Sequence, residues 1–200
     1  MNRGLFIAFE GVDGTGKTTQ LELLADYLRS RGLDVVETRE PTDGPFGRRI
    51  RELYVDRGSC TPDEELDLFI QDRKQHVAEV IAPALASGKA VLTDRYYFST
   101  AAYQGAAGCN PDAIFSANSF APMPDMVLLL TMDPEVSVQR IEQSRGETCN
   151  DFEQLEQLKK VADLFAGFSD SCITRIDAAG TVDQVQADIR RAVQPLLGTG

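Results

Sequence analysis

A glycine-rich loop near the N-terminus holds the residues best suited to chemistry, in the pattern Gly11-x-x-x-x-Gly16-Lys17-Thr18. Glycines let the backbone curl until several N–H groups point at phosphate oxygens. The lysine ammonium then reaches the outer phosphates, and the threonine hydroxyl is a ligand for Mg²⁺. The pattern therefore predicts a site for a nucleoside triphosphate. We expect this site to comprise Gly11, Asp13, Gly14, Thr15, Gly16, Lys17, Thr18 and Thr19.

Such a loop has to be positioned by a strand before it and a helix after it. Residues 5–9 form a short apolar run that favours a strand. After the loop, apolar side chains recur at helical spacing, at Leu21, Leu24, Ala25 and Leu28. The helix presents the positive end of its dipole to the same anion. A glycine-rich turn that binds no ligand is the alternative, and these flanking elements disfavour it.

Further along the chain, β-rich runs alternate with helical stretches. These runs are Val35–Thr38, Ala90–Thr93, Met126–Met132 and Cys172–Ile176. Near-continuous apolar runs of this kind are typical of a parallel sheet that is covered on both faces. The sequence therefore predicts an α/β fold of the P-loop NTPase type, a doubly wound five-stranded parallel sheet in a single domain over residues 1–200. Ligands of such sheets bind beyond the carboxyl ends of the strands.

Two capping boxes mark the starts of predicted helices. Residues 61–64 read Thr-Pro-Asp-Glu, and residues 181–184 begin with threonine and end with glutamine. The first of these helices continues with apolar side chains at helical spacing, and we expect Pro83 and Gly88 to bend or end it.

Composition limits the ligands and the compartment. The net charge is −11, which argues against a nucleic-acid or membrane surface because both select for basic patches. No apolar run is long enough to span a bilayer and the N-terminus enters a strand at once, so we expect a cytoplasmic protein. Cys60, Cys109, Cys149 and Cys172 match no familiar zinc spacing with the lone His76, and free thiols are the expected state.

Charged residues follow several of the predicted strands. They are Arg39 and Glu40 after the second strand, Asp94 and Arg95 after the third, and Asp133 after the fourth. Because the carboxyl ends of parallel strands share one edge, we expect Lys17, Arg39 and Arg95 to converge there and to neutralise a phosphoryl group in transfer. We expect Asp94 to serve with Thr18 on the magnesium side. An ion pair with Glu40 or a neighbouring carboxylate is the alternative for Arg39.

At this level of detail the sequence resembles a known family, the thymidylate kinases. The resemblance covers essentially the whole chain and rests on several motifs together. They are Gly11 to Thr19, Thr38-Arg39-Glu40-Pro41, Leu68-Phe69-x-x-Asp72-Arg73-x-Gln75-His76, Asp94-Arg95-Tyr96 and Ala101-Ala102-Tyr103-Gln104-Gly105. Together they are far more specific than the loop alone, which many unrelated folds share.

The resemblance implies a function. The expected reaction is ATP-dependent phosphorylation of dTMP to dTDP in dTTP biosynthesis, by direct in-line transfer with ATP and Mg²⁺ as cofactors. The expected partners are these small-molecule substrates and a second copy in a homodimer, with no nucleic acid and no membrane. Two alternatives stay open. One is a kinase for another deoxynucleotide or a nucleoside, and the other is a nucleotide-binding module without catalysis.

The resemblance also implies an acceptor site. Its residues are Asp13, Arg39, Phe69, Arg73, Arg95, Thr100, Tyr103 and Gln104. Arg39 and Arg95 match arginines around the acceptor phosphate, and Asp13 matches an acidic position near the sugar 3′-hydroxyl. Phe69 and Arg73 lie four residues apart on one helix face, where a ring can stack on a base and a guanidinium can donate to its carbonyl edge.

Aromatic residues in this site have alternative roles. Ordinary core packing is the alternative for Phe69. An aromatic ring packed under the sugar would leave no room for a 2′-hydroxyl, which would give a preference for deoxyribose. Tyr103 is the candidate for that ring, with Tyr96 and Tyr97 as alternatives.

The chain departs from the family pattern in the predicted lid, about residues 140–153. Members without an arginine in the phosphate loop place one in a lid stretch resembling Arg-Gly-x-x-Asp-Arg-x-Glu, and the second arginine of that stretch is missing here. We expect Arg145 to be the catalytic lid arginine. Arg140 is the alternative, and a solvated helix end with ion pairs is another. Residues 42–44, Thr-Asp-Gly, stand where many members carry a glycine-rich turn.

Overall fold

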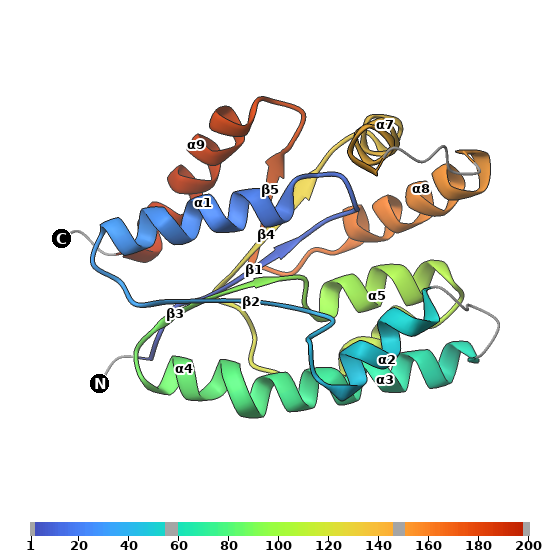
Figure 1. Ribbon diagram of the computed structural model, residues 1–200, viewed down its shortest axis with the longest axis horizontal. Coiled ribbons are helices and arrows are strands. Elements are labelled where there is room, and N and C mark those ends of the chain that lie inside the picture. The colour runs from blue at the N-terminus through green and yellow to red at the C-terminus, as the bar shows by residue number, and fades with distance from the viewer. Residues whose placement is uncertain (1–2, 55–59, 146–150, 198–200) are drawn as a thin grey trace.

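The computed structural model describes residues 3–54, 60–145 and 151–197, with side chains outside 142–154. Within these residues lies one five-stranded sheet, whose strands alternate with helices (Figure 1). The strands are β1 (Phe6–Glu10), β2 (Val35–Arg39), β3 (Ala90–Asp94), β4 (Met126–Thr131) and β5 (Ile173–Asp177). All five predicted strands are confirmed, with boundaries that differ by one residue or less at most ends.

The sheet is parallel throughout, in the order β2-β3-β1-β4-β5. The chain therefore winds outward in both directions from β1, which lies at the centre. In the register, Phe9 of β1 pairs with Asp94 of β3, and Arg39 of β2 pairs with the same aspartate. The doubly wound α/β prediction is confirmed. The carboxyl ends of β1, β2 and β3 consequently lie side by side.

Helices fill the connections between the strands. They are α1 (Lys17–Ser30), α2 (Pro45–Leu53), α3 (Pro62–His76), the π-helical turn η2 (Val77–Ile81), α4 (Ala82–Ala86), α5 (Tyr97–Ala106), α6 (Pro111–Ala117), α7 (Pro134–Arg145), α8 (Asp151–Gly167), α9 (Val182–Val193) and the 3₁₀ turn η3 (Gln194–Leu197). Both capping boxes are present, at Thr61 with Glu64 and at Thr181 with Gln184. None of the helices in the described part of the chain is both long and apolar enough to cross a membrane.

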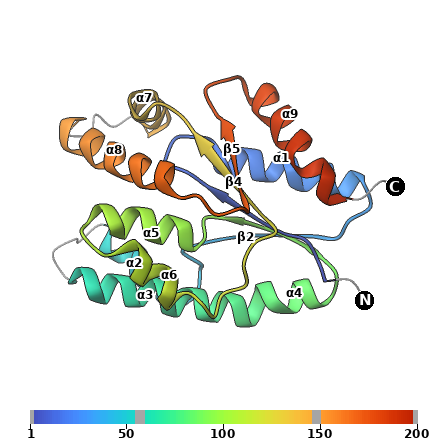
Figure 2. The same ribbon diagram turned by 180° about the vertical axis from the view of Figure 1, so that it is seen from behind.

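Two hydrophobic cores form on opposite faces of the sheet (Figures 1 and 2). One contains Leu24 of α1 and Ile189 of α9 against Ile7 and Phe9 of β1. The other contains Phe6 and Ala8, the alternate residues of the same strand, against side chains of α4, α5, α6 and α8. Because successive strand residues point to opposite faces, β1 supplies both cores and is buried along its whole length.

The helix after Thr61 passes Pro83 and ends just before Gly88, one of the two residues expected to bend or end it. Helical backbone continues from α3 through η2 into α4, and Pro83 lies in the first turn of α4 without ending it. In η2 the hydrogen bonds skip one more residue than in an α-helix, as the bond from the Ala82 N–H to the Val77 carbonyl shows. The proline falls directly after this wider turn. Gly88 follows the helix in the left-handed conformation (φ 77°) and leads into β3.

Candidate phosphoryl-transfer site

The phosphate loop connects β1 to α1. Gly11, Gly14 and Gly16 have positive φ angles, and α1 begins at Lys17 without a capping side chain, so its first N–H groups face the loop. The Lys17 ammonium donates to the Val12 carbonyl at 2.9 Å. Burial, and to a lesser extent the nearby Arg95 guanidinium, lowers the pKa of Lys17 to about 8. The lysine is thus held inside the curl of the loop, where outer phosphates would bind.

The first turns of α7 press directly on this loop. A Cβ atom on Gly14 would lie 2.6 Å from the Ser137 carbonyl oxygen and 3.1 Å from Cγ1 of Ile141, and the glycine has a φ of +82°. Both the backbone conformation and the close approach of α7 therefore demand glycine at this position. This contact explains physically why the loop carries no arginine at residue 14.

We expect Gly14→Ala to lower the free energy of unfolding by on the order of 3 kcal/mol, because strain from the positive φ adds to the clash with the α7 backbone. Gly32→Ala is the matched control, since Gly32 has a φ of +84° and a Cβ there would meet no packing partner within 4 Å in the described structure. That control should lose only about 1 kcal/mol. Urea unfolding of both variants measures the difference, and equal losses would contradict a packing role for α7.

Thr18 and Asp94 form the predicted hydroxyl and carboxylate pair. The Thr18 hydroxyl donates to Asp94 Oδ2 at 2.5 Å, and the other carboxylate oxygen, Oδ1, is buried without a hydrogen-bond partner among the described residues. A cavity of about 400 Å³ opens beside this pair. Oxygen ligands of this kind suit Mg²⁺ with most of its coordination supplied by water and phosphate. No cluster of three or more metal-ligating side chains occurs within the described residues.

Arg95 lies at the carboxyl edge, directly after β3, the strand between β2 and β1. Its φ of 71° is the one positive value among the described non-glycine residues. The guanidinium donates to Ser99 Oγ at 2.8 Å, to Asp13 Oδ1 at 2.7 Å and to the Tyr103 hydroxyl at 3.2 Å, and it lies 4.9 Å from the centre of the Tyr103 ring. A left-handed conformation costs energy for a residue with a Cβ atom and is concentrated at functional sites. Asp94, its neighbour, is bonded to Thr18 instead of this arginine.

Behind Arg95 lies a buried carboxylate that no sequence pattern identified as a site residue. Glu10, the last residue of β1, accepts hydrogen bonds from the backbone N–H groups of Tyr96 (2.9 Å) and Ser99 (3.1 Å), and from the Ser99 hydroxyl. The N-cap residue of α5, Tyr96, makes no side-chain capping bond, so Glu10 of the neighbouring strand accepts the N–H groups at the start of the helix instead. Burial raises the pKa of the Glu10 carboxyl to about 7.

This raised pKa predicts a specific dependence of stability on pH. Since the ordinary value is 4.5, the folded chain binds more protons at Glu10 than the unfolded chain between pH 4.5 and 7, and stability must fall as pH rises through that window. We expect the free energy of unfolding of Glu10→Gln, relative to wild type, to rise by on the order of 3 kcal/mol from pH 5 to pH 8. Urea unfolding at intervals of one pH unit measures this. Parallel curves for the two proteins would contradict it.

Arg39 lies on the surface beside the same edge. Its guanidinium forms an ion pair with Asp43 at 2.9 Å, and the side chain is 62% exposed. Arg51 reaches the same carboxylate at 3.0 Å, and Arg48 donates to the Asp43 carbonyl. Arg39 therefore does form an ion pair with a neighbouring carboxylate, that of Asp43 and not that of Glu40. These arginines gather around one carboxylate within reach of the cavity beside Thr18 and Asp94.

The turn that replaces the family's glycine-rich segment is held by an aspartate of α3. Asp72, which is buried, accepts from the Thr42 N–H at 2.8 Å and from the Thr42 hydroxyl at 2.6 Å. The Thr42 hydroxyl in turn accepts from the N–H of Gly44. Side-chain hydrogen bonds therefore fix residues 42–44, and so the position of Asp43 between the arginines.

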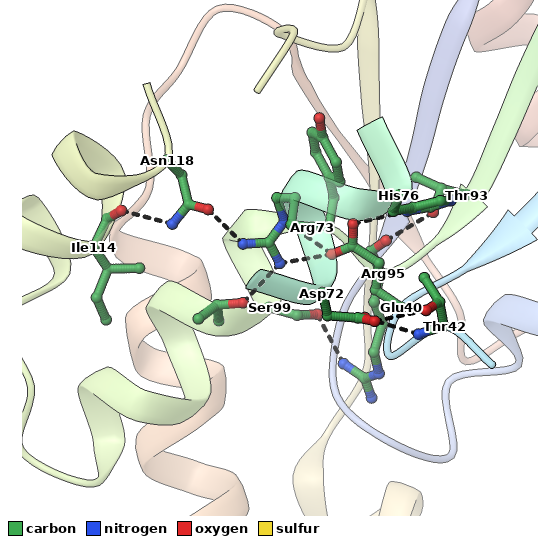
Figure 3. Close-up of polar contacts among 12 residues, drawn as sticks. Glu40, Thr42, Asp72, Arg73, His76, Thr93, Arg95, Ser99, Ile114 and Asn118 are labelled. Carbon is green, nitrogen blue, oxygen red and sulfur yellow. Dashed lines mark hydrogen bonds and ion pairs between the residues drawn. The ribbon is translucent and has the colours of Figure 1, made fainter. Parts of the chain in front are cut away.

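Arg73 is buried in a polar cluster below the site (Figure 3). Its Nε and Nη2 donate to one oxygen of Glu40 at 2.9 and 2.6 Å, Nη2 also donates to Thr100 at 2.9 Å, and Nη1 donates to Asn118 at 2.6 Å. These bonds use four of the five N–H groups of a guanidinium. The other oxygen of Glu40 lies 2.9 Å from Nδ1 of His76. The orientation of Arg73 is thus fixed by residues from three other segments of the chain.

Of the remaining predicted acceptor residues, Thr100 contacts Arg73 and Tyr103 contacts Arg95. Phe69 is half-buried and belongs to neither hydrophobic core, which disfavours the packing alternative. Tyr103 contacts Arg95, whereas Tyr96 and Tyr97 lie in the core of the α5 face and are unsuited to stand under a sugar. Gln104 is buried, and its side-chain oxygen has no hydrogen-bond partner among the described residues.

Comparisons with known proteins identify the family of this chain. The family model described as thymidylate kinase matches residues 9–189. The chain belongs to the thymidylate kinase family. It is 53% identical over 196 residues to a thymidylate kinase of Desulfotalea psychrophila, which covers 98% of this chain and 97% of the relative. Thymidylate kinases of Xylella fastidiosa strain M23 and Xanthomonas campestris pv. campestris strain B100 are each 44% identical over 182 residues, which are 91% of this chain and 83% and 79% of the relatives.

In this thymidylate kinase, Arg145 and Arg140 are the two arginines predicted for the lid. Arg145 is the last residue of α7, and its side chain lies outside the described part of the structure, as do residues 146–150. Arg140 donates to the Ala178 carbonyl at 3.2 Å, at the far end of β5. That bond ties Arg140 to the loop before α9, which leaves Arg145 as the better candidate for a lid arginine. Cys149 also lies outside the described residues, and Cys60, Cys109 and Cys172 are free thiols.

Three residues of this thymidylate kinase site were not predicted from the sequence as functional positions. Glu40 and Asn118 hold Arg73, and Glu10 contacts the start of α5. Glu10 is the last residue of the buried strand β1 and Glu40 directly follows β2, so an acidic residue at a strand end was the available signal. Asn118 follows α6 without any motif, and its contact with Arg73 joins positions 45 residues apart.

Proposed function

We propose that this chain transfers the γ-phosphoryl group of ATP directly to the phosphate of dTMP, with the residues of the carboxyl edge in the roles given below. Membership of the thymidylate kinase family gives the activity itself, phosphorylation of dTMP to dTDP in the synthesis of dTTP. The observation that carries the proposed roles is the arrangement of Lys17 and Arg95 at the adjoining carboxyl ends of β1 and β3.

On the donor side, the loop N–H groups and Lys17 bind the outer phosphates of ATP. The ammonium exchanges the Val12 carbonyl for phosphate oxygens, which are stronger acceptors because they are charged. Thr18 and Asp94 would hold Mg²⁺, which supplies charge neutralisation on these phosphates when it is bound. The remaining loop residues, Gly11, Asp13, Gly14, Thr15, Gly16 and Thr19, complete the proposed donor site.

On the acceptor side, an oxygen of the dTMP phosphate attacks the γ-phosphorus, and the bond to the β,γ-bridging oxygen of ATP breaks as ADP leaves. The attacking oxygen is already anionic at neutral pH, so no strong general base is needed. Arg95 and Arg39 bind the acceptor phosphate, and Arg145 adds positive charge in the transition state. Arg73 and Phe69 bind the base, while Asp13, Thr100, Tyr103 and Gln104 line the sugar and base pocket.

A steady-state comparison of acceptors tests the proposal. Coupled ADP release is measured with dTMP, dUMP, dGMP and thymidine at fixed ATP and Mg²⁺. We expect dTMP to have the highest kcat/KM, and we expect EDTA to abolish turnover until Mg²⁺ is restored. Equal turnover of the four acceptors would overturn the assignment of the acceptor site, and full activity in EDTA would overturn the proposed role of Thr18 and Asp94.

The lid arginine gives a separate prediction. We expect Arg145→Ala to lower kcat by about 10²-fold with little change in either KM, because it removes one charge donor used chiefly in the transition state. Arg140→Ala is the matched control on the same helix and should stay within about threefold of wild type, since its partner is the Ala178 carbonyl. The reverse ranking of these two variants would transfer the catalytic role to Arg140.

We also propose a homodimer and a lid spanning about residues 140–153 within a single domain. Phe120 and Met123 are exposed large apolar side chains, and the Lys74 ammonium of α3 lies 5.7 Å from the Phe120 ring. This apolar surface beside α3 would be covered in a dimer. Light scattering should give twice the mass of one chain. A monomer at every concentration tested would contradict the dimer.

A further inference from the structure

A buried carboxylate lies one hydroxyl away from the arginine of the acceptor site. Ser99 Oγ donates to Glu10 Oε2 and accepts from Arg95 Nη1 at 2.8 Å. Glu10 is fully buried, and Ser99 is 7% exposed. The order Glu10, Ser99, Arg95 is therefore a continuous hydrogen-bonded path inside the protein. It starts at the residue that immediately precedes the phosphate loop.

We propose that Glu10 is a positioning residue, which holds the guanidinium of Arg95 in place through the hydroxyl of Ser99. This inference rests on the proposed role of Arg95 at the acceptor phosphate. The same carboxylate accepts the N–H groups of Tyr96 and Ser99 with its other oxygen, so it fixes the start of α5 as well as the guanidinium. One side chain thereby ties the donor loop to the acceptor helix.

The direction of the hydrogen bonds requires the ionised form of Glu10. A carboxylate accepts only, so the Ser99 hydroxyl donates to it and keeps its lone pairs for the Arg95 N–H. A protonated or amide group at residue 10 would donate to Ser99 Oγ instead, which leaves the hydroxyl proton of Ser99 without this acceptor. The buried negative charge that attracts Arg95 is lost at the same time.

Charged and titratable groups face Glu10 from three elements. Arg95 after β3 lowers the pKa of Glu10 against the larger effect of burial. Lys17 of α1 and Tyr97 of α5 are also close enough for Glu10 to raise their pKa values. Because the pKa of Glu10 is about 7, only a fraction of the molecules carry the ionised Glu10 in mildly acidic solution. Titration of the dTMP phosphate acts equally on wild type and variants, so it cancels from a ratio of the two.

The test measures the kinetics of Glu10→Gln, Ser99→Ala and the double variant. At pH 8 we expect each single variant to lower kcat/KM for dTMP about tenfold, with the KM of ATP within twofold of wild type. The double variant should lose no more than the worse single variant, because both break one path. The ratio of wild type to Glu10→Gln should grow from pH 6 to pH 8, and the unfolding midpoint of Glu10→Gln at pH 8 should not fall.

Asp125→Asn is the matched control, because Asp125 accepts the N–H of Phe6 at the other end of β1, far from the carboxyl edge. Its kinetics should match wild type. Three results would each overturn the positioning role. They are a loss of kcat/KM in the double variant equal to the product of the single losses, a ratio of wild type to Glu10→Gln that is constant with pH, and losses of kcat/KM that accompany a fall in the unfolding midpoint. If the variants retain wild-type kinetics while Arg95→Gly is inactive, the positioning role fails and the function of Arg95 stands. If Arg95→Gly is itself active, the proposed function of that residue fails.

Discussion

Lys17→Ala should abolish nearly all phosphoryl transfer, with a fall in kcat on the order of 10⁴-fold. The ammonium is buried within the loop at 2.9 Å from the Val12 carbonyl, and no other lysine is buried among the described residues. Removing it takes away the ammonium group that we propose binds the outer phosphates of ATP. Folding should be retained, since the Val12 carbonyl also accepts from the Thr15 hydroxyl and so keeps a hydrogen bond when the lysine is removed.

Coupled ADP release at saturating dTMP measures this effect, and circular dichroism checks the fold. Lys160→Ala is the control, because Lys160 is exposed on α8 and lies outside every motif of the site. It should be indistinguishable from wild type. ADP release by Lys17→Ala at the wild-type rate would refute the donor side of the mechanism, whatever the outcome for the acceptor residues.

Arg95→Gly should lower kcat/KM for dTMP by about 10³-fold. Glycine adopts the φ of 71° without strain, so the substitution removes the guanidinium and preserves the backbone path into α5. The lost group bridges Asp13, Ser99 and Tyr103 in addition to its proposed contact with the acceptor phosphate. A loss of kcat/KM of this size would therefore result from the missing charge and hydrogen bonds of the guanidinium rather than from a distorted turn.

Arg95→Lys separates these two contributions. Lysine keeps the positive charge but lacks the planar fork that donates to several partners at once, so it should recover only part of the activity. Arg191→Ala, which removes an exposed arginine paired with Asp188 on α9, is the control and should leave kinetics unchanged. Wild-type KM for dTMP in both Arg95 variants would mean that this arginine does not bind the acceptor.

Local signals in the sequence predicted most of the fold. Strand positions followed from short apolar runs, and both capping boxes appeared where threonine stands three residues before glutamate or glutamine. Pro83 was misleading because a π-helical turn precedes it, and no local pattern reveals such a turn. The phosphate loop and its strand were equally accessible, because glycine spacing, lysine and threonine lie within eight consecutive residues.

The sequence alone could not predict which groups the charged residues contact. Arg39 pairs with Asp43 rather than Glu40, because Glu40 is drawn into the interior by Arg73 and His76. Contacts of this kind depend on how α3 crosses the end of β2, which is set by packing of the whole domain. Glu10 meets the start of α5 only because β1 and β3 are neighbours in a particular register. Single-sequence patterns do not contain that register.

The contact between Gly14 and α7 bears on where an arginine can stand relative to the γ-phosphate. With the Ser137 carbonyl so close to the loop, a side chain at residue 14 and this placement of α7 exclude each other. An arginine that residue 14 cannot supply can come from the lid instead, and α7, the helix that blocks residue 14, ends at Arg145, the lid arginine that we propose. The packing of α7 on the loop thus limits which part of the chain can carry the catalytic arginine. Moving the arginine into the loop of this chain would first require α7 to be set farther from it.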